Sequence, residues 1–241
     1  MNPDLDCLDA IVADMIEALR PLRFGRPVTH VYNPLEYARE PLRQYHAKFA
    51  STPKEVVFLG MNPGPWGMAQ TGIPFGEIHA VRDWMQINAL VGIPGEMHPK
   101  RPVIGFSCTK REVSGRRLWG WAQKTFKTPT LFFKRFFVAN YCPLLFIEKS
   151  GRNRTPDQIR AAERKPLQEI CDHALRLTID YFKPRYVVGI GKFAETRARN
   201  AIANPKIKIG GITHPSPANP QANRGWEPLM VKQLAALGIR I

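Results

Sequence analysis

Three shortages narrow the classes to which this chain can belong. No stretch of about 18 consecutive apolar residues occurs, which excludes a membrane-spanning helix. The four cysteines lie far apart and form no CxxC pair, so we expect reduced thiols, an intracellular protein and neither a zinc nor an iron–sulfur centre. Acidic residues are scarce, because 20 aspartates and glutamates face 35 lysines and arginines, which gives a net charge of +15. This surplus favours a polyanionic partner, most often nucleic acid.

The histidines and the N-terminus add two further exclusions. None of the six histidines forms a pair at metal-ligand spacing, and we expect neither a metal nor an organic cofactor. Residues 1–20 are acidic where a signal peptide would be basic, and their apolar positions follow helical spacing. We therefore expect an amphipathic helix over residues 4–20 rather than a leader.

Positive charge is concentrated between residues 100 and 165. This segment holds 16 lysines and arginines against 4 acidic residues, with aromatic residues and glycines between them. The pattern predicts a nucleic-acid-binding surface. The alternative is a solvated basic surface without a partner, or a binding protein without catalytic activity.

The length and composition fit one domain. With 241 residues, of which 44% are hydrophobic, the chain can bury a core of its own. We expect a monomer with a single domain over residues 1–241, in which residues 1–50 form a helical extension packed on the rest.

Apolar runs alternate with amphipathic segments along the chain, which predicts a parallel sheet with helices on both faces, an α/β sandwich of three layers. The expected strands are residues 55–59, 132–141, 185–190 and 207–213. The expected helices, besides the first, are residues 41–50, 78–91, 115–127 behind a Ser114 cap, a long helix from the pair Thr155-Pro156 to about 182, 192–203 and 227–237.

A loop rich in glycine and proline follows the first expected strand. Between Gly60 and Glu77 the chain places five glycines and three prolines, far more than a simple connection needs. Such a loop brings backbone close to a ligand. Its other side chains offer an amide, a thioether and aromatic faces, which predicts a pocket wall for a flat polar ring: Met61, Asn62, Trp66, Gln70 and Phe75.

Polar or glycine residues follow each expected strand: Asn62, Asn140, Gly191 and His214. Open α/β sheets bind ligands at the carboxyl ends of their strands, so these residues should meet at one rim. The GxGxxA pattern at residues 189–194 is typical of a dinucleotide site, but no acidic residue follows about 20 positions later. We interpret it as a tight strand–helix turn. A Rossmann-type oxidoreductase would explain the sheet but not the basic surface.

Two long motifs resemble those of one known family. The segment GMNPGPWGMAQTGIPFGE (residues 60–77) is similar to the first motif of the single-strand-selective monofunctional uracil-DNA glycosylases, and HPSPANPQANRGW (214–226) is similar to the last. Shorter similarities, such as EVSGRRLWGW (112–121) and FVANYCPLLF (137–146), lie between them. The resemblance covers most of the chain from about residue 58 onward.

The resemblance implies a uracil-DNA glycosylase fold with a four-stranded, mainly parallel sheet, and hydrolysis of the N-glycosidic bond of uracil in DNA without a lyase step. It assigns placement of the attacking water to Asn62, donation to uracil O2 to His214, base stacking to Phe75 and reading of the uracil edge to Asn140. Met61 belongs to the same pocket. The first four each have a purely structural alternative: Asn62 as a turn residue, His214 as a hydrogen-bonded histidine, Phe75 as a core aromatic and Asn140 as a strand-end amide.

The last motif implies a loop that enters the duplex and holds the flipped base out. Family members carry arginine where this chain has Ala218, so neighbouring polar residues would have to compensate. The expected DNA contacts are Arg116, Arg117, Pro215, Ser216, Pro217, Ala218, Asn219, Pro220, Gln221, Asn223 and Arg224.

The predicted substrate range depends on Gly64. Better-known uracil-DNA glycosylases read GQDPYH at this loop, which aligns Gly64 with a tyrosine that blocks the C5 edge of the base. A glycine there implies space beside C5, and hence activity on 5-hydroxymethyluracil as well as uracil.

Overall fold

A four-stranded parallel sheet forms the centre of the computed structural model, which describes residues 3–241. Its strands are β2 (Val56–Gly60), β3 (Phe136–Asn140), β6 (Tyr186–Ile190) and β7 (Lys208–Ile212), in the order β3-β2-β6-β7. Every neighbouring pair is parallel. The central strands β2 and β6 are buried along their whole length, which explains their continuous apolar runs.

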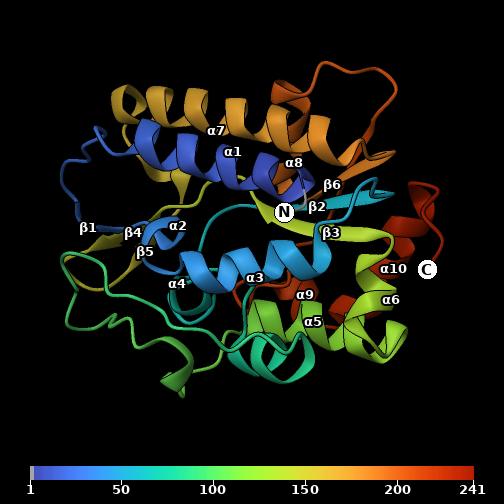
Figure 1. Ribbon diagram of the computed structural model, residues 1–241, viewed down its shortest axis with the longest axis horizontal. Coiled ribbons are helices and arrows are strands. Elements are labelled where there is room, and N and C mark those ends of the chain that lie inside the picture. The colour runs from blue at the N-terminus through green and yellow to red at the C-terminus, as the bar shows by residue number, and fades with distance from the viewer. Residues whose placement is uncertain (1–2) are drawn as a thin grey trace.

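Helices cover both faces of this sheet (Figure 1). On one side lie α1 (Pro3–Leu19), α7 (Ala161–Phe182) and α8 (Lys192–Ala201), with α1 packed along α7. On the other side lie α5 (Val113–Phe126) and α10 (Trp226–Ala236), which contact each other. The predicted α/β sandwich of three layers is confirmed.

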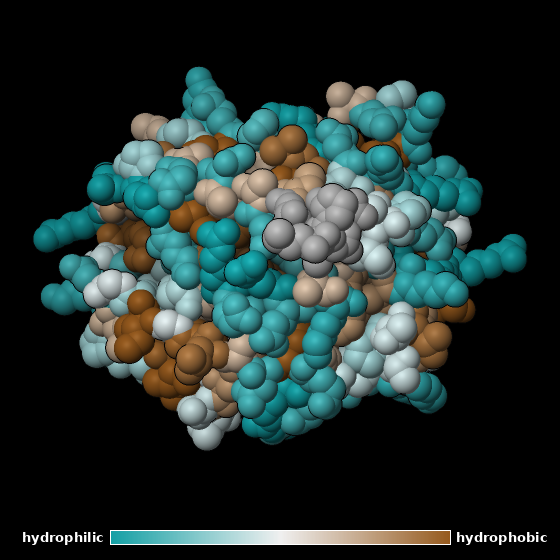
Figure 2. Space-filling view, in the orientation of Figure 1, coloured by the Kyte–Doolittle hydropathy of each residue, from teal (hydrophilic) through white to brown (hydrophobic). Residues whose placement is uncertain are grey.

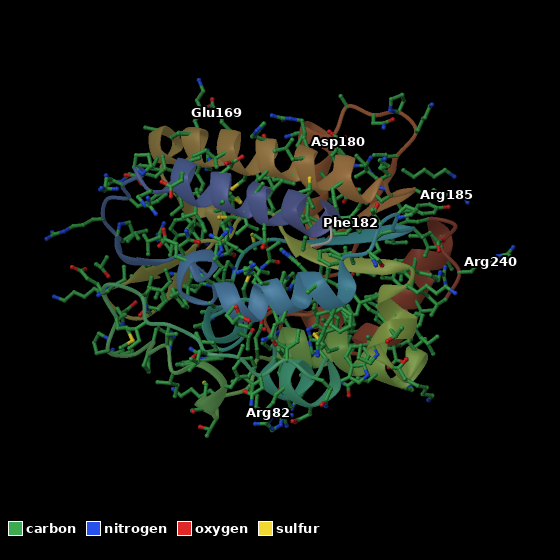
Figure 3. The ribbon with its side chains drawn as sticks, viewed as in Figure 1. Arg82, Glu169, Asp180, Phe182, Arg185 and Arg240 are labelled. Carbon is green, nitrogen blue, oxygen red and sulfur yellow. The ribbon has the colours of Figure 1, made fainter. Side chains whose placement is uncertain are left out.

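Aromatic rings fill much of the core. Phe182 of α7 packs on Phe137 of β3 with ring centroids 4.3 Å apart, and Figure 3 shows it inside the molecule while the labelled arginines lie at the periphery. The edge strand β3 is covered by α3 (Arg39–Phe49), whose Tyr45 hydroxyl donates to the Val138 carbonyl at 3.0 Å. This bond occupies a carbonyl that an open sheet edge would leave unpaired.

A second sheet was not predicted. Strands β1 (Val28–Tyr32), β4 (Leu145–Glu148) and β5 (Asn153–Arg154) form an antiparallel sheet in the order β1-β4-β5. The sequence pattern predicted no strand between the expected helices 4–20 and 41–50, and none between residues 141 and 185. The pairing of β1 with β4 joins segments more than 100 residues apart, so no local pattern announces it.

Two predicted boundaries are wrong for local reasons. The expected strand 132–141 begins only at Phe136, because Phe132 and Phe133 belong to the short helix α6 (Pro129–Phe133), which Thr128 caps. The expected helix 78–91 ends at Trp84, and Gln86 then adopts a left-handed backbone with φ of 55°.

Two predicted helix caps also differ. Helix α5 begins after Glu112, which makes Ser114 a residue of its first turn rather than its cap. Thr155 does form a capping box, but it opens only a 3₁₀ turn (Pro156–Gln158) before α7 starts at Ala161. Three four-residue helices complete the fold: α2 (Pro34–Tyr37), α4 (Met68–Thr71) and α9 (Pro220–Asn223).

The surface is mainly hydrophilic in the view of Figure 2, with an apolar area at the lower left where Figure 1 places the segment after Trp84. The large apolar residues exposed in that segment are Leu90, Ile93, Met97 and Ile104. Among residues 3–241, no helix has both the length and the apolar composition that a membrane crossing requires.

Candidate active site

A cleft of about 620 Å³ opens at the carboxyl ends of the parallel strands. It brings together Asn62 after β2, Asn140 at the end of β3 and His214 after β7, together with Met61, Gly64 and Phe75 of the glycine-rich loop. Gly191, directly after β6, lies against His214, since a Cβ there would be 3.2 Å from the histidine Cβ. Residues far apart in the sequence thus share one rim.

The amide of Asn62 is oriented by the chain that follows β3. Its Nδ2 donates to the carbonyl of Leu144 at 3.2 Å. The amide oxygen is then the end left to accept a hydrogen bond from a molecule in the cleft. An amide held in this way can orient water but cannot take a proton from it.

His214 is held as a neutral donor. Its Nδ1 accepts a hydrogen bond from the Ser216 backbone N–H at 3.1 Å, so in the neutral ring the proton lies on Nε2. Burial lowers the pKa of His214 to about 4, which keeps the ring uncharged near neutral pH. The ring centroid lies 5.9 Å from that of Phe75.

Phe75 is fixed in a strained backbone conformation. Its φ of 53° is uncommon for a bulky residue, and a backbone of this kind costs on the order of 1–3 kcal/mol. The indole of Trp119 donates to the Phe75 carbonyl at 2.9 Å and stabilises the turn. Such strain is typical of functional positions.

Asn140 lines the cleft and carries an unpaired amide oxygen. Its Nδ2 donates to the sulfur of Met68 at 3.1 Å, whereas its Oδ1 is enclosed and has no partner among the described residues. Gly60 is necessary for this arrangement, because a Cβ there would lie 2.2 Å from Asn140 Oδ1 and 2.6 Å from the Phe75 ring. A buried amide oxygen without a donor is costly unless a ligand supplies one.

Two residues expected in the pocket wall lie elsewhere. Trp66 is outside the cleft, beneath Lys110 at 4.2 Å and Arg101 at 5.3 Å from its ring centroid. The buried amide of Gln70 donates to the carbonyls of Pro65 and Pro102 and accepts from the Ile104 N–H. It braces the loop rather than facing a ligand.

The loop from residue 215 to 226 forms one wall of the cleft and is internally bonded. Asn219 caps α9 and donates to the His214 carbonyl at 3.4 Å, while Asn223 donates to the Pro217 carbonyl at 2.8 Å. Ser216, Ala218, Asn219 and Pro220 line the cleft. Pro217, Gln221, Asn223 and Arg224 are exposed, and Pro215 is buried.

The two adjacent arginines expected to contact DNA have different surroundings. Arg117 donates to the Pro215 carbonyl at 3.0 Å and to Asn223 Oδ1 at 2.9 Å, so it fastens the loop to α5. Arg116 is exposed and makes no ion pair within residues 3–241. Of these two arginines, Arg116 is therefore the one whose guanidinium is exposed to solvent without a contact to the loop.

Outside the glycine-rich loop, sequence reasoning did not identify four residues of the cleft: Glu112, Ser114, Asn153 and Thr155. Asn153 and Thr155 lie in or just after β5, the strand that local patterns did not reveal. Glu112 changes the interpretation of Gly64. A Cβ at Gly64 would lie 2.9 Å from Glu112 Oε1, so the space expected to be open beside this glycine is partly filled by a carboxyl group.

The glycines of the GxGxxA pattern serve packing. A Cβ at Gly189 would lie 2.2 Å from the backbone nitrogen of Glu195, so helix α8 can approach β6 only because this residue is glycine. Gly191 has φ of +94°, which glycine adopts without strain. Close packing and the turn explain both residues without a dinucleotide.

Comparisons with known proteins agree with this arrangement. The family model of the Uracil DNA glycosylase superfamily matches residues 47–236. The single-strand selective monofunctional uracil-DNA glycosylase of Rattus norvegicus is 50% identical over 223 residues, which cover 92% of this chain and 80% of that protein. The Bos taurus protein of the same description is 48% identical over 225 residues, covering 92% and 83%.

One solved structure supports the fold. The crystal structure of Pedobacter heparinus SMUG2 matches with a TM-score of 0.66 and covers 94% of this chain and 97% of that one. Its sequence identity is 18%, so the comparison concerns the arrangement of the chain alone.

Proposed function

The chain belongs to the single-strand selective monofunctional uracil-DNA glycosylases of the uracil DNA glycosylase superfamily, and we propose that its cleft hydrolyses the N-glycosidic bond of uracil in DNA and leaves an abasic site. One observation carries this proposal. An amide oriented to hold water, at Asn62, and a neutral imidazole donor, at His214, reach the same cleft from different strands. The relatives from Rattus norvegicus and Bos taurus carry the matching description.

Binding would require the base to leave its strand and enter the cleft. Phe75 would stack on the ring face, a contact worth roughly 1–3 kcal/mol in protein–nucleic acid complexes. The enclosed Oδ1 of Asn140 would accept from uracil N3–H, which supplies the donor that this oxygen lacks within the described protein. Rotation of the same amide away from Met68 would let Nδ2 donate to O4.

The bond to the base would break with charge developing on both fragments. The leaving uracil takes the electron pair of the glycosidic bond, and its negative charge is delocalised onto O2, where Nε2–H of His214 donates. The sugar becomes positively polarised at C1′. Water held by the Asn62 amide oxygen attacks there, loses its proton to the released base or solvent, and becomes the hydroxyl group of the abasic sugar.

A lyase step would need an amine that attacks C1′. No lysine lines the cleft in the part of the chain that the structure describes. The proposed reaction therefore ends at the abasic site, and the enzyme is monofunctional.

DNA would be held by the exposed cations around the cleft and by the loop from residue 215 to 226. We propose that the exposed Arg116 contacts phosphate, and that the Lys110–Trp66 pair contributes a cation and an aromatic face. We propose that the protein acts on single- and double-stranded DNA as a monomeric domain of residues 1–241, in the compartment that holds the genome.

The substrate range would include uracil with a small polar group at C5. Gly64 contributes no side chain to the cleft, and the neighbouring Glu112 carboxyl makes this wall polar. We expect 5-hydroxymethyluracil to be removed and thymine to be poor, because a methyl group forms no hydrogen bond with that wall.

The test is incubation of the wild-type protein with a single-stranded oligonucleotide containing one uracil, followed by alkali to cut abasic sites. The expected result is cleavage at the uracil only after alkali, and no cleavage of a matched thymine oligonucleotide. An intact uracil strand would refute the proposed activity, and cleavage without alkali would refute its monofunctional character.

A further inference from the structure

The carboxyl group of Glu112 occupies a recess made by three glycines. A Cβ would lie 2.9 Å from its Oε1 at Gly64, 2.1 Å from its Oε2 at Gly67 and 3.0 Å from its Oε2 at Gly115. Real Cβ atoms do not approach other atoms as closely as the first two. Two glycines of the loop and one of helix α5 thus leave space for this side chain beside the cleft.

Glu112 does not serve the helix that it precedes. It is the N-cap residue of α5, yet its side chain forms no capping hydrogen bond. Serine, threonine, aspartate or asparagine would cap the helix better. Its Oε2 is enclosed and has no partner among the described residues, which costs stability. Positions that break a local rule in this way are commonly functional.

The environment favours the uncharged carboxyl. Burial, and to a smaller extent the neighbouring Glu77, raises the pKa of Glu112 from 4.5 to about 7. In the protonated form the group has both a donor and an acceptor. It can therefore donate a hydrogen bond to a hydroxyl group or accept one from it.

The position of Glu112 follows from the other contacts of the base. In the proposed function, His214 takes the O2 edge of uracil and Asn140 takes N3 and O4. The opposite edge, C5 and C6, would then face another part of the cleft lining, to which Gly64 and the adjacent Glu112 carboxyl belong.

We propose that Glu112 is a specificity-determining residue whose carboxyl group hydrogen-bonds a polar substituent at C5 of the flipped pyrimidine. The inference rests on the proposed function, because it requires a pyrimidine in this cleft. A hydroxymethyl group would pair with the carboxyl, and uracil would leave room for a water in its place. The methyl of thymine would leave the buried carboxyl without a partner, and such sites reject the analogue that lacks the polar group.

Binding to uncleavable substrates tests this role apart from catalysis. Fluorine at C2′ stabilises the glycosidic bond, so oligonucleotides with 2′-fluorinated nucleotides of uracil or 5-hydroxymethyluracil report affinity alone. The measured quantity is the ratio of the two Kd values. Glu112→Leu and Glu112→Ala should shift this ratio by about tenfold against the hydroxymethyl base, the size expected for one hydrogen bond.

Two variants separate specificity from structure. Glu112→Gln keeps the volume and retains both a donor and an acceptor. It should hold the ratio within about threefold of wild type, a smaller change than the loss of one hydrogen bond would cause. Glu77→Gln is the matched control. Glu77 is also a buried acid of this region, paired with Arg111 at 3.0 Å, but it does not line the cleft. Its replacement should lower thermal stability and leave the ratio unchanged, because the Glu112 carboxyl can pair with a hydroxyl group in either protonation state.

The outcomes separate the two proposals. A ratio that stays at the wild-type value in Glu112→Leu and Glu112→Ala would overturn the role of Glu112, whether or not uracil is excised. The role is equally overturned if only the Glu112→Ala protein folds and its ratio is unchanged, or if Glu77→Gln shifts the ratio equally. If the wild-type protein excises no uracil but the Kd ratio still depends on Glu112, the glycosylase activity is refuted and the role of Glu112 in binding is not.

Discussion

Three polar residues of the cleft are each fixed by a hydrogen bond at one end and left free at the other. Asn62 gives its Nδ2 to Leu144, and His214 receives the Ser216 N–H at Nδ1. Asn140 is similar, with Nδ2 on Met68 and Oδ1 unpaired among the described residues. Groups oriented before the substrate arrives cost no reorganisation during the reaction, which is the usual source of large electrostatic rate effects.

Replacement of His214 should affect chemistry more than binding. We expect His214→Ala to slow uracil release by about 10²–10³-fold, the loss typical of one oriented donor to a developing anion. The measurement is the single-turnover rate at saturating enzyme, with the melting temperature as a control for folding. A rate equal to that of wild type would remove His214 from the reaction.

The low pKa of His214 gives a pH prediction. Because burial sets the pKa at about 4 rather than near 6.5, the neutral donor persists on the acid side of neutrality. Protonation near pH 4 would place a proton on Nδ1 and break the bond from Ser216 N–H. The folded pKa lies below the unfolded value, so the stability that the neutral ring contributes is complete above about pH 6.5 and is lost as the pH falls toward 4.

Single-turnover rates on uracil between pH 4 and 7 test this point. We expect no fall near pH 6.5 and an acid limb only close to pH 4. A half-maximal rate near pH 6.5, absent in the His214→Ala protein, would show that the ring titrates as an exposed histidine.

At the scale of elements, one arginine of α5 holds the loop from residue 215 to 226 while its neighbour does not. Arg117→Gln should loosen the loop, because the bonds to Pro215 and Asn223 are lost. We expect a fall in uracil excision of about tenfold, as for the loss of one or two charge-assisted hydrogen bonds. Hydrogen exchange of the loop amides should rise in parallel.

Arg116→Gln is the matched control for that variant. It removes the same charge from the same helix but no contact with the loop, and its guanidinium is exposed. We expect slightly weaker DNA binding, with loop exchange and excision at saturating enzyme as in wild type. Equal loop exchange in the two variants would mean that Arg117 does not fasten this loop.

The central sheet could be predicted from the sequence because buried parallel strands are apolar throughout. Residues 56–60 and 186–190 carry this pattern in a few consecutive positions, and the polar residues after them mark the rim. The strand β1 carries no such pattern, because it pairs with β4 at the surface and its middle residues are partly exposed. Its existence depends on a partner more than 100 residues away.

The site, like the sheet, could be predicted where its residues lie in recognisable local patterns. Asn62, Phe75, Asn140 and His214 lie in motifs long enough to be specific, and all four line the cleft. Glu112 could not be found in this way, since its role depends on three glycines that surround it only in the folded chain. Local preference also favoured Ser114 as the helix cap, but tertiary packing places Ser114 on the cleft wall instead.

For the whole molecule, the dominant property is charge. A net charge of +15 should make DNA affinity strongly dependent on salt, because each phosphate contact releases counterions. We expect log K to fall linearly with log salt, with a slope of about −0.7 for each phosphate contacted on single strands. A flat plot would mean that the basic segment is a solvated surface that does not bind DNA phosphates.

The central claim is that the cleft at the strand ends performs hydrolysis, and Asn62→Ala tests it most directly. The substitution removes the amide that would place water while leaving His214, Phe75 and the basic surface in position. Binding and single-turnover excision are measured on the same uracil oligonucleotide. We expect affinity close to that of wild type and excision below about a tenth of the wild-type rate, as for other losses of an oriented catalytic group. A folded variant that retains more than that fraction would contradict the account.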